Sequence, residues 1–167
     1  KGKTIAVRSK NGPAATVIDG NANGSVVLFV SHENSGAVLD GFTLTGGNGL
    51  ASSSDRIGGG ICILDSSPTI NNCIITNNGA VYGGGIYSDG SLTITNSTIS
   101  NNGADDGGGI YRASHGGWIY ETTPMTVSSC IISGNTAYYN GGGIDSIGPA
   151  SITDSVIDNN SAVLDDG

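Results

Sequence analysis

One short pattern recurs along almost the whole chain. Three glycines followed by isoleucine occur four times, starting at residues 58, 83, 107 and 141. Successive copies are therefore 25, 24 and 34 residues apart, and the last interval contains an insertion. A period of roughly two dozen residues predicts a fold in which each repeat stacks on the one before it.

Each repeat has the composition of short β-strands. Segments such as 93–95 and 99–102 place isoleucine beside threonine, serine or asparagine, and Gly, Asn, Asp and Ser separate such segments. This alternation is typical of strands with one buried face, and runs of the residues that favour helices are missing from the repeats. The sequence predicts an all-β, parallel solenoid with about six coils and three short strands in each coil.

Aligning the repeats places like residues in columns. We expect the isoleucine column to fill the core, because alternate side chains of a strand share a face. We expect the asparagine column to hydrogen-bond from coil to coil where the chain bends. The isoleucine column is Ile75, Ile99, Ile132 and Ile157, and the asparagine column is Asn78, Asn102, Asn135 and Asn160.

The three cysteines do not form a disulfide framework. Cys73 and Cys130 fall in one inward column but two coils apart, at about 10 Å for strands spaced ~4.8 Å, which is beyond the reach of a disulfide. We expect both to be buried space-fillers. Cys62 directly follows an inward isoleucine, so it is predicted to point outward.

The pairing of GGGI with IxxN resembles the GGA[ILV] and FxxN repeats of the chlamydial polymorphic outer membrane proteins. More broadly, the chain is similar to the right-handed parallel β-helix proteins of the pectate-lyase-like superfamily. The resemblance extends from about Thr4 to Gly167, and it departs from the chlamydial pattern in using Ile for Phe and a third Gly for Ala. It implies a right-handed parallel β-helix and an adhesive role, whereas the fold alone does not specify a function.

We expect residues 1–167 to form a single β-helix domain. We also expect this domain to be a fragment of a longer solenoid, because the last repeat stops before its glycine run. Two segments interrupt the repeat pattern. Residues 46–57 are predicted to be a polar loop, and residues 112–123 an inserted surface loop. Insertions in a solenoid often build its binding face.

The composition narrows the classes of partner. Fourteen acidic and six basic residues give a net charge of −8, which argues against nucleic acid and anionic membranes. No apolar run approaches the roughly 20 residues that a membrane span needs. No metal-ligand spacing is present, so we expect neither a metal nor a cofactor. An extracellular or cell-surface location is predicted.

The candidate ligand-binding surface follows the glycine runs. Tyr87, Tyr111 and Asp145 each stand two residues after a run, so they should lie side by side on adjacent coils. Aromatic rings beside polar and charged groups suit a sugar, although stacked tyrosines can also simply stiffen neighbouring strands. The candidate ligand-binding residues, including those of the inserted loop, are Tyr87, Tyr111, Arg112, His115, Trp118, Tyr120 and Asp145.

Three functions remain open at this stage. The first is a non-catalytic structural or adhesin-like module that presents a face to a polysaccharide or a surface protein. The second is a carbohydrate-active enzyme, a lyase or hydrolase, with Arg112, Asp145 and Tyr111 as its candidate residues. The third is a subunit that self-associates, end to end into a filament or laterally.

Overall fold

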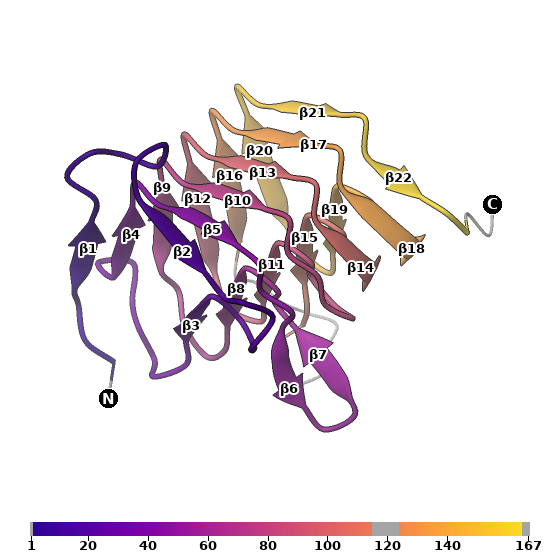
Figure 1. Cartoon of the computed structure of the whole chain (residues 1–167), viewed down its shortest axis with the longest axis horizontal. Coiled ribbons are helices and arrows are strands. Elements are labelled where there is room, and N and C mark those ends of the chain that lie inside the picture. The colour runs from indigo at the N-terminus through magenta and orange to yellow at the C-terminus, as the bar shows by residue number, and fades with distance from the viewer. Residues whose placement is uncertain (1, 115–123, 165–167) are drawn as a thin grey trace.

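The computed structural model describes residues 2–114 and 124–164, and it shows short strands wound into a stack of coils (Figure 1). Sheets A and B each contain six strands, and sheet C contains five. In sheet order, sheet A is β1 (Ala6–Arg8), β4 (Val38–Asp40), β9 (Thr69–Asn71), β12 (Leu92–Thr95), β16 (Met125–Ser128) and β20 (Ala150–Thr153). Sheet B is β2 (Val17–Asp19), β5 (Thr43–Thr45), β10 (Ile74–Thr76), β13 (Thr98–Ser100), β17 (Ile131–Ser133) and β21 (Val156–Asp158). Sheet C is β3 (Val27–Phe29), β8 (Ile61–Ile63), β11 (Ile86–Ser88), β15 (Ile110–Arg112) and β19 (Ile144–Ser146).

The later coils carry an additional short strand that the sequence did not predict. Sheet D consists of β14 (Gly103–Asp106), β18 (Thr136–Asn140) and β22 (Ser161–Ala162), and it extends outward from the stack (Figure 1). It forms because the chain stays extended between the asparagine corner and the next glycine run. The predicted all-β parallel architecture is confirmed, with this fourth strand added.

The core is built from columns of identical side chains. Ile75 pairs with Ile99, Ile99 with Ile132, and Ile132 with Ile157, each in direct parallel register. The first three are fully buried, and the residues on either side of Ile75 and Ile99 in their strands are only partly buried. Every coil therefore adds one slice to a single continuous core.

An asparagine ladder runs beside the isoleucine column. The Nδ2 of Asn78 donates to Oδ1 of Asn102 (3.1 Å), Asn102 donates in the same way to Asn135 (3.0 Å), and Asn135 to Asn160 (2.9 Å). The same Oδ1 atoms also accept the backbone N–H of the preceding asparagine. Each Nδ2 makes a further bond to a backbone carbonyl, as in Asn102 to Ile75. Buried amides that are paired in this way carry little desolvation cost.

The glycine runs are required by two different constraints. The first glycine of each run has a positive φ, 69° at Gly83 and 65° at Gly107, which favours glycine. The second lies between coils: a Cβ on Gly84 would stand 2.4 Å from the Gly103 oxygen and 2.7 Å from the Gly108 oxygen. No side chain fits there, so the repeated GGG reflects both a turn and a close approach of backbones.

Two sequence predictions were wrong in detail. Residues 46–57 are not an irregular loop, because β6 (Leu50–Ser52) and β7 (Asp55–Ile57) pair as an antiparallel hairpin that projects from the stack (Figure 1). Cys62 does not face solvent but is fully buried. The turn at Gly58 folds over the outer side of β8, so close that a Cβ on Gly58 would lie 2.8 Å from the Cys62 Cβ. Cys73 and Cys130 are buried free thiols, as predicted.

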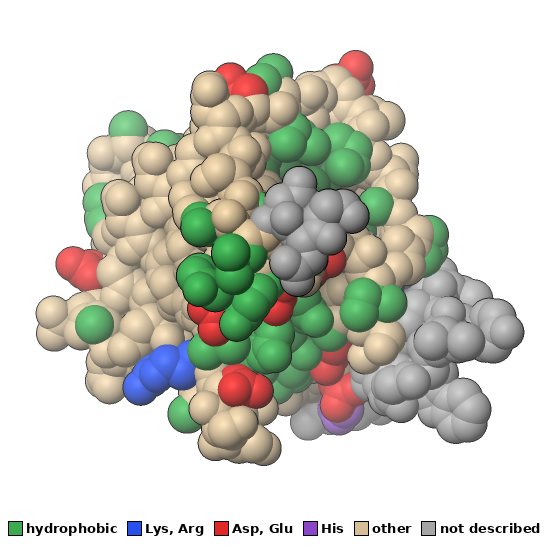
Figure 2. Space-filling model, turned by 90° about the vertical axis from the view of Figure 1, so that its right-hand side faces the viewer, with side chains coloured by type: hydrophobic (Ala, Val, Ile, Leu, Met, Phe, Trp, Pro, Cys, Tyr) green, Lys and Arg blue, Asp and Glu red, His purple; other side chains and the backbone are tan. Residues whose placement is uncertain are grey.

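The two ends of the described stack leave core columns uncovered. Ile152 and Ile157 of the last coil are 42% and 47% exposed, whereas Val127 and Ile132, their register partners in the coil below, are 0% exposed. Figure 2, which views this end, shows apolar side chains interspersed with acidic ones. At the other end, Ile5 and Val7 of the first coil are about half exposed.

The asparagine ladder yields a stability prediction. Replacing Asn102 with Ala removes the acceptor of Asn78 and the donor to Asn135, and both partners stay buried. We expect the free energy of unfolding to fall by about 3 kcal/mol, because each stranded group costs about 1–3 kcal/mol. Urea unfolding measures the change.

Asn23 offers the matched control, since it is an exposed asparagine outside the ladder. Asn23→Ala should change the free energy of unfolding by less than about 0.5 kcal/mol. Equal effects of the two substitutions would show that the ladder does not stabilise the stack.

Candidate functional site

The outer face of sheet C gathers most of the predicted ligand-binding residues that the structure describes. Tyr87 on β11 pairs in register with Tyr111 on β15, and Tyr111 pairs with Asp145 on β19. The preceding isoleucine in each strand points into the core, so the next side chain points outward. Three residues from separate repeats are thereby placed in one column, as the spacing predicted.

The glycine turn adds a second column beside the first. Tyr82 and Asp106 immediately precede their glycine runs and are bridge partners, and Asp106 pairs in turn with Asn140. Because the chain reverses sharply at Gly83, Tyr82 comes close to the tyrosine column. Its ring centroid lies 5.1 Å from that of Tyr111, with the ring planes at 47°.

We call these five residues, Tyr82, Tyr87, Tyr111, Asp106 and Asp145, the tyrosine step. All five side chains are partly buried. The rings of Tyr87 and Tyr111 are stacked, with centroids 5.7 Å apart and planes at 14°. Since β15 lies between β11 and β19, the second face of Tyr111 is turned toward the coil of Asp145. Aspartate is shorter than tyrosine, so the aromatic column ends in a step with a ring on one side and a carboxylate on the other.

The electrostatic environment of the step is negative. Burial raises the pKa of Tyr87 to about 12, and the Asp89 carboxylate adds to the increase. Burial also raises the pKa of Tyr111, with further contributions from Asp145 and Asp106. The pKa of Asp145 is raised as well, first by burial and then by Asp106. Each of these shifts has the sign expected for an acidic group near carboxylates.

Asp106 is held in place by a neighbouring coil. Its Oδ1 accepts hydrogen bonds from the backbone N of Asn140 (3.1 Å) and from the Asn140 side-chain Nδ2 (2.8 Å). Two bonds to one residue leave this carboxylate little freedom to rotate. Asp106 is therefore preorganised before any ligand arrives.

Arg112 does not belong to the outer face, contrary to the sequence prediction. It follows Tyr111 directly, so it points to the opposite side of β15 and is 0% exposed. Its register partners are Ser88 and Ser146, and its guanidinium donates to the backbone carbonyl of Ile147. A buried guanidinium on the inner face cannot act as a catalytic base or bind an external sugar.

The remaining candidates, His115, Trp118 and Tyr120, lie outside the described residues. Conversely, the sequence prediction left Tyr82 and Asp106 out of its candidates. The available signal was their position immediately before a glycine run, where a positive-φ turn brings them beside the following strand. Within residues 2–114 and 124–164, no group of three or more His, Cys, Asp or Glu side chains is placed to hold a metal ion.

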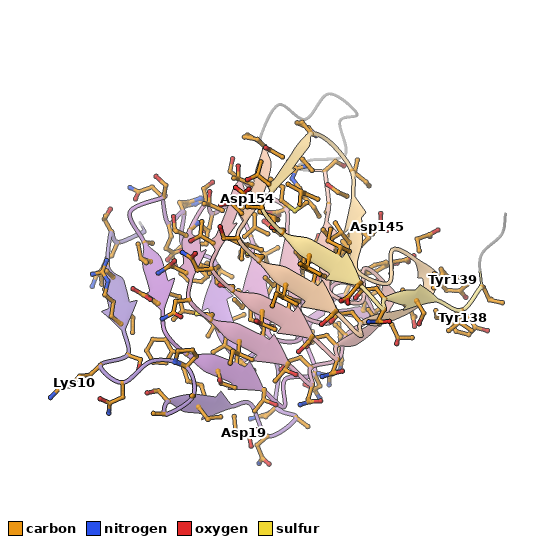
Figure 3. The ribbon with its side chains drawn as sticks, turned by 90° about the horizontal axis from the view of Figure 1, so that it is seen from above. Lys10, Asp19, Tyr138, Tyr139, Asp145 and Asp154 are labelled. Carbon is orange, nitrogen blue, oxygen red and sulfur yellow. The ribbon has the colours of Figure 1, made fainter. Side chains whose placement is uncertain are left out.

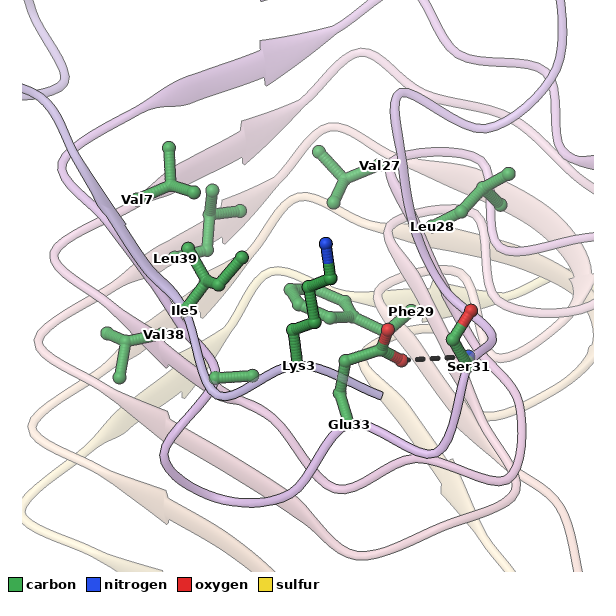
Figure 4. A pocket seen from close by; sticks show the side chains of 11 residues that line it. Lys3, Ile5, Val7, Val27, Leu28, Phe29, Ser31, Glu33, Val38 and Leu39 are labelled. Carbon is green, nitrogen blue, oxygen red and sulfur yellow. Dashed lines mark hydrogen bonds between the residues drawn. The ribbon is translucent and has the colours of Figure 1, made fainter. Parts of the chain in front are cut away.

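A separate hollow of about 410 Å³ opens at the N-terminal end of the stack (Figure 4). Its walls are mainly apolar, with Phe29 and Leu39 among them, and Lys3 and Glu33 are its charged lining residues. The Glu33 carboxylate is engaged by the Ser31 backbone N–H (2.9 Å) and the Ser66 hydroxyl (2.9 Å). The hollow lies where the first coil has no described coil stacked on it, so it is the open end of the core.

These features define a parallel β-helix that carries an aromatic and acidic surface on one wall. The chain belongs to the right-handed β-helix family, since the model for the right-handed beta helix region matches residues 17–166. Comparison with curated proteins found no match, and comparison with solved structures found none either. The narrower resemblance to the chlamydial proteins stays a prediction. Where the chain is described, it contains no helix that could cross a bilayer.

The buried phenol of Tyr87 leads to a prediction about alkaline stability. Its pKa is raised from 10.0 to about 12 in the fold, so the fold favours the neutral form. The corresponding stability is complete below the unfolded pKa and is lost as the pH rises through the folded pKa. We therefore expect the free energy of unfolding to fall between pH 10 and 12, and to fall less in Tyr87→Phe.

Urea unfolding at a series of pH values across this range measures the difference. Tyr138→Phe is the control, because Tyr138 projects from the outlying strand β18 (Figure 3) and is 47% exposed. If Tyr87→Phe and Tyr138→Phe reduce the loss of stability at alkaline pH equally, that loss does not come from Tyr87.

Proposed function

We propose that the chain is a non-catalytic binding module of a secreted or cell-surface protein, and that it holds carbohydrate at the tyrosine step. The observation that carries the proposal is the end of the aromatic column. Tyr111 turns a ring face toward the coil of Asp145, its direct register partner. An apolar surface and a hydrogen-bond acceptor are thus adjacent.

This pair of surfaces matches the two sides of a sugar. The C–H face of a pyranose packs against an aromatic ring, and its hydroxyls donate to carboxylates. Asp145 and Asp106 supply such acceptors at the step. The phenolic hydroxyls of the tyrosines can both donate and accept, which suits the mixed donors and acceptors around a sugar ring.

The scaffold supports binding by holding the step rigid. Tyr87, Tyr111 and Asp145 lie on three parallel strands that are hydrogen-bonded in register. The ring of Tyr111 contacts two other rings, those of Tyr82 and Tyr87. A site that is ordered beforehand spends less of its interaction energy on immobilising side chains.

The proposal predicts which side chain matters most for binding. Tyr111→Ala removes the central ring of the step. We expect at least about a fivefold loss of affinity for the oligosaccharides that the wild-type chain retains on a glycan array, since a stacked ring contributes about 1 kcal/mol or more. Titration calorimetry then measures the affinity.

Tyr138→Ala is the control, because it deletes an exposed tyrosine on β18 (Figure 3). Asp145→Asn serves as a second variant of the step that retains the size of the side chain and the aromatic stack. If Tyr111→Ala is folded and binds like the wild-type chain, carbohydrate is not bound at this site.

A second function, glycoside hydrolysis, is favoured by one observation. Burial raises the pKa of Asp145, and the nearby Asp106 carboxylate adds to the increase, so two carboxyl groups lie close together at the step. Hydrolysis uses two such groups, one of them protonated to act as a general acid. A lyase that relies on Arg112 as its base is not proposed, because that residue is buried on the inner face.

Hydrolysis predicts a release of reducing sugars from a polysaccharide that falls at least about a hundredfold in Asp145→Asn, in line with the loss of a general acid. Asp154→Asn is the control, since Asp154 lies apart from Asp145 (Figure 3). If the wild-type chain releases no reducing sugars from any polysaccharide that it binds, hydrolysis is ruled out and only the non-catalytic function remains. End-to-end stacking stays a prediction, to be checked by sizing at rising concentration.

A further inference from the structure

The described charges that act on the ring of Tyr111 are both negative. Burial is the largest cause of its raised pKa, and the Asp145 and Asp106 carboxylates add to it, followed by the Tyr82 phenol. They come from two separate coils: Asp145 is the direct register partner of Tyr111, and Asp106 is fixed by its bonds to Asn140. The partly buried ring of Tyr111 is thus accompanied by two carboxylates.

None of the described cations shares the outer face with the step. Arg112 is on the same strand as Tyr111, but its side chain is buried on the inner face. Lys3, Arg8 and Lys10 are in or next to the first coil, where Arg8 pairs with Asp40 at 3.3 Å. Arg56 donates to Asn48 Oδ1 (3.0 Å) and to the Gly49 carbonyl (3.1 Å). In the part of the chain that the structure describes, neither Asp106 nor Asp145 forms an ion pair with Lys or Arg. A positive group on a ligand would have no competitor from these side chains.

From this arrangement we propose that the tyrosine step selects amino sugars with a free ammonium group over N-acetylated sugars and over uronates. The proposal rests on the carbohydrate-binding function and adds the class of sugar. An ammonium group on the pyranose lies near the ring face of Tyr111, where a cation–π contact is favourable. The same group is attracted by Asp145 and Asp106, whose charges add.

The two competing sugar classes fail for different reasons. An N-acetylated sugar keeps the same ring for stacking but has no positive charge, so it loses only the electrostatic part. A uronate brings a third carboxylate to a site that already holds two, on a chain with a net charge of −8. Like charges at close range are destabilising, most strongly where burial reduces screening.

Three oligomers of equal length test the proposal: β-1,4-linked glucosamine, its fully N-acetylated counterpart, and galacturonate. Titration calorimetry at a pH where the amine is protonated should give about tenfold tighter binding for the glucosamine oligomer than for the N-acetylated one. The galacturonate oligomer should bind more weakly than both. The advantage should shrink at high salt, as expected for a partly exposed charge interaction.

The variants assign the preference to the step. Asp145→Asn and Asp106→Asn should each weaken binding of the glucosamine oligomer severalfold more than binding of the N-acetylated oligomer, so that the advantage of the glucosamine oligomer shrinks. Asp154→Asn, which removes the same charge at a position away from Asp145 (Figure 3), should leave the advantage unchanged. Equal losses in all three variants would point to the overall charge and overturn the proposal.

The possible failures are distinguishable. If the N-acetylated oligomer binds as tightly as the glucosamine oligomer, and Tyr111→Ala abolishes both, the charge preference is wrong while carbohydrate binding stands. If the galacturonate oligomer binds more tightly than the glucosamine oligomer, the charge preference is likewise wrong while carbohydrate binding stands. If no oligomer binds, both proposals fall. An oligolysine peptide that binds as well as glucosamine, independently of Tyr111, would show a general attraction of cations and overturn the selectivity for amino sugars.

Discussion

The structure depends on each coil lying in exact register on the one below. Backbone hydrogen bonds between parallel strands set the spacing, and the asparagine ladder secures the alignment, because each buried amide is bonded both to the next asparagine and to a backbone carbonyl. A slip by one residue would turn the isoleucine column outward. It would also strand several buried amides at once. Hydrophobic burial and amide pairing therefore favour the same register.

The glycine runs allow the coils to stack closely and place the side chains of the tyrosine step beside one another. Their second glycines lie against backbone of the next coil, which leaves no space for a side chain. Their first glycines reverse the chain, so that Tyr82 meets a ring that follows a different glycine run. The same three residues thus permit tight stacking and bring together side chains that lie in separate repeats. The tyrosine step is a consequence of the turn that the fold requires.

The outer and inner faces of sheet C have separate chemistry because side chains alternate. Tyr111 and Arg112 are neighbours in sequence, yet one contributes to a partly exposed aromatic surface and the other is buried. This separation leaves carboxylates as the described charged groups beside the ring of Tyr111. Burial is the largest cause of the raised pKa values of Tyr111 and Asp145, and neighbouring carboxylates add to it.

The sequence by itself determined the parallel coils, the isoleucine and asparagine columns, and the alignment of Tyr87, Tyr111 and Asp145, because a fixed repeat length places equivalent residues above one another. Only the tertiary structure decided that Arg112 and Cys62 are buried, that residues 46–57 form a hairpin, and that Tyr82 and Asp106 join the step. These outcomes depend on which segments fold over a strand and how sharply a turn reverses. The repeat pattern marks Tyr82 and Asp106 as equivalent positions before a glycine run, but it does not show that the turn brings Tyr82 against the ring of Tyr111, 29 residues further along the chain.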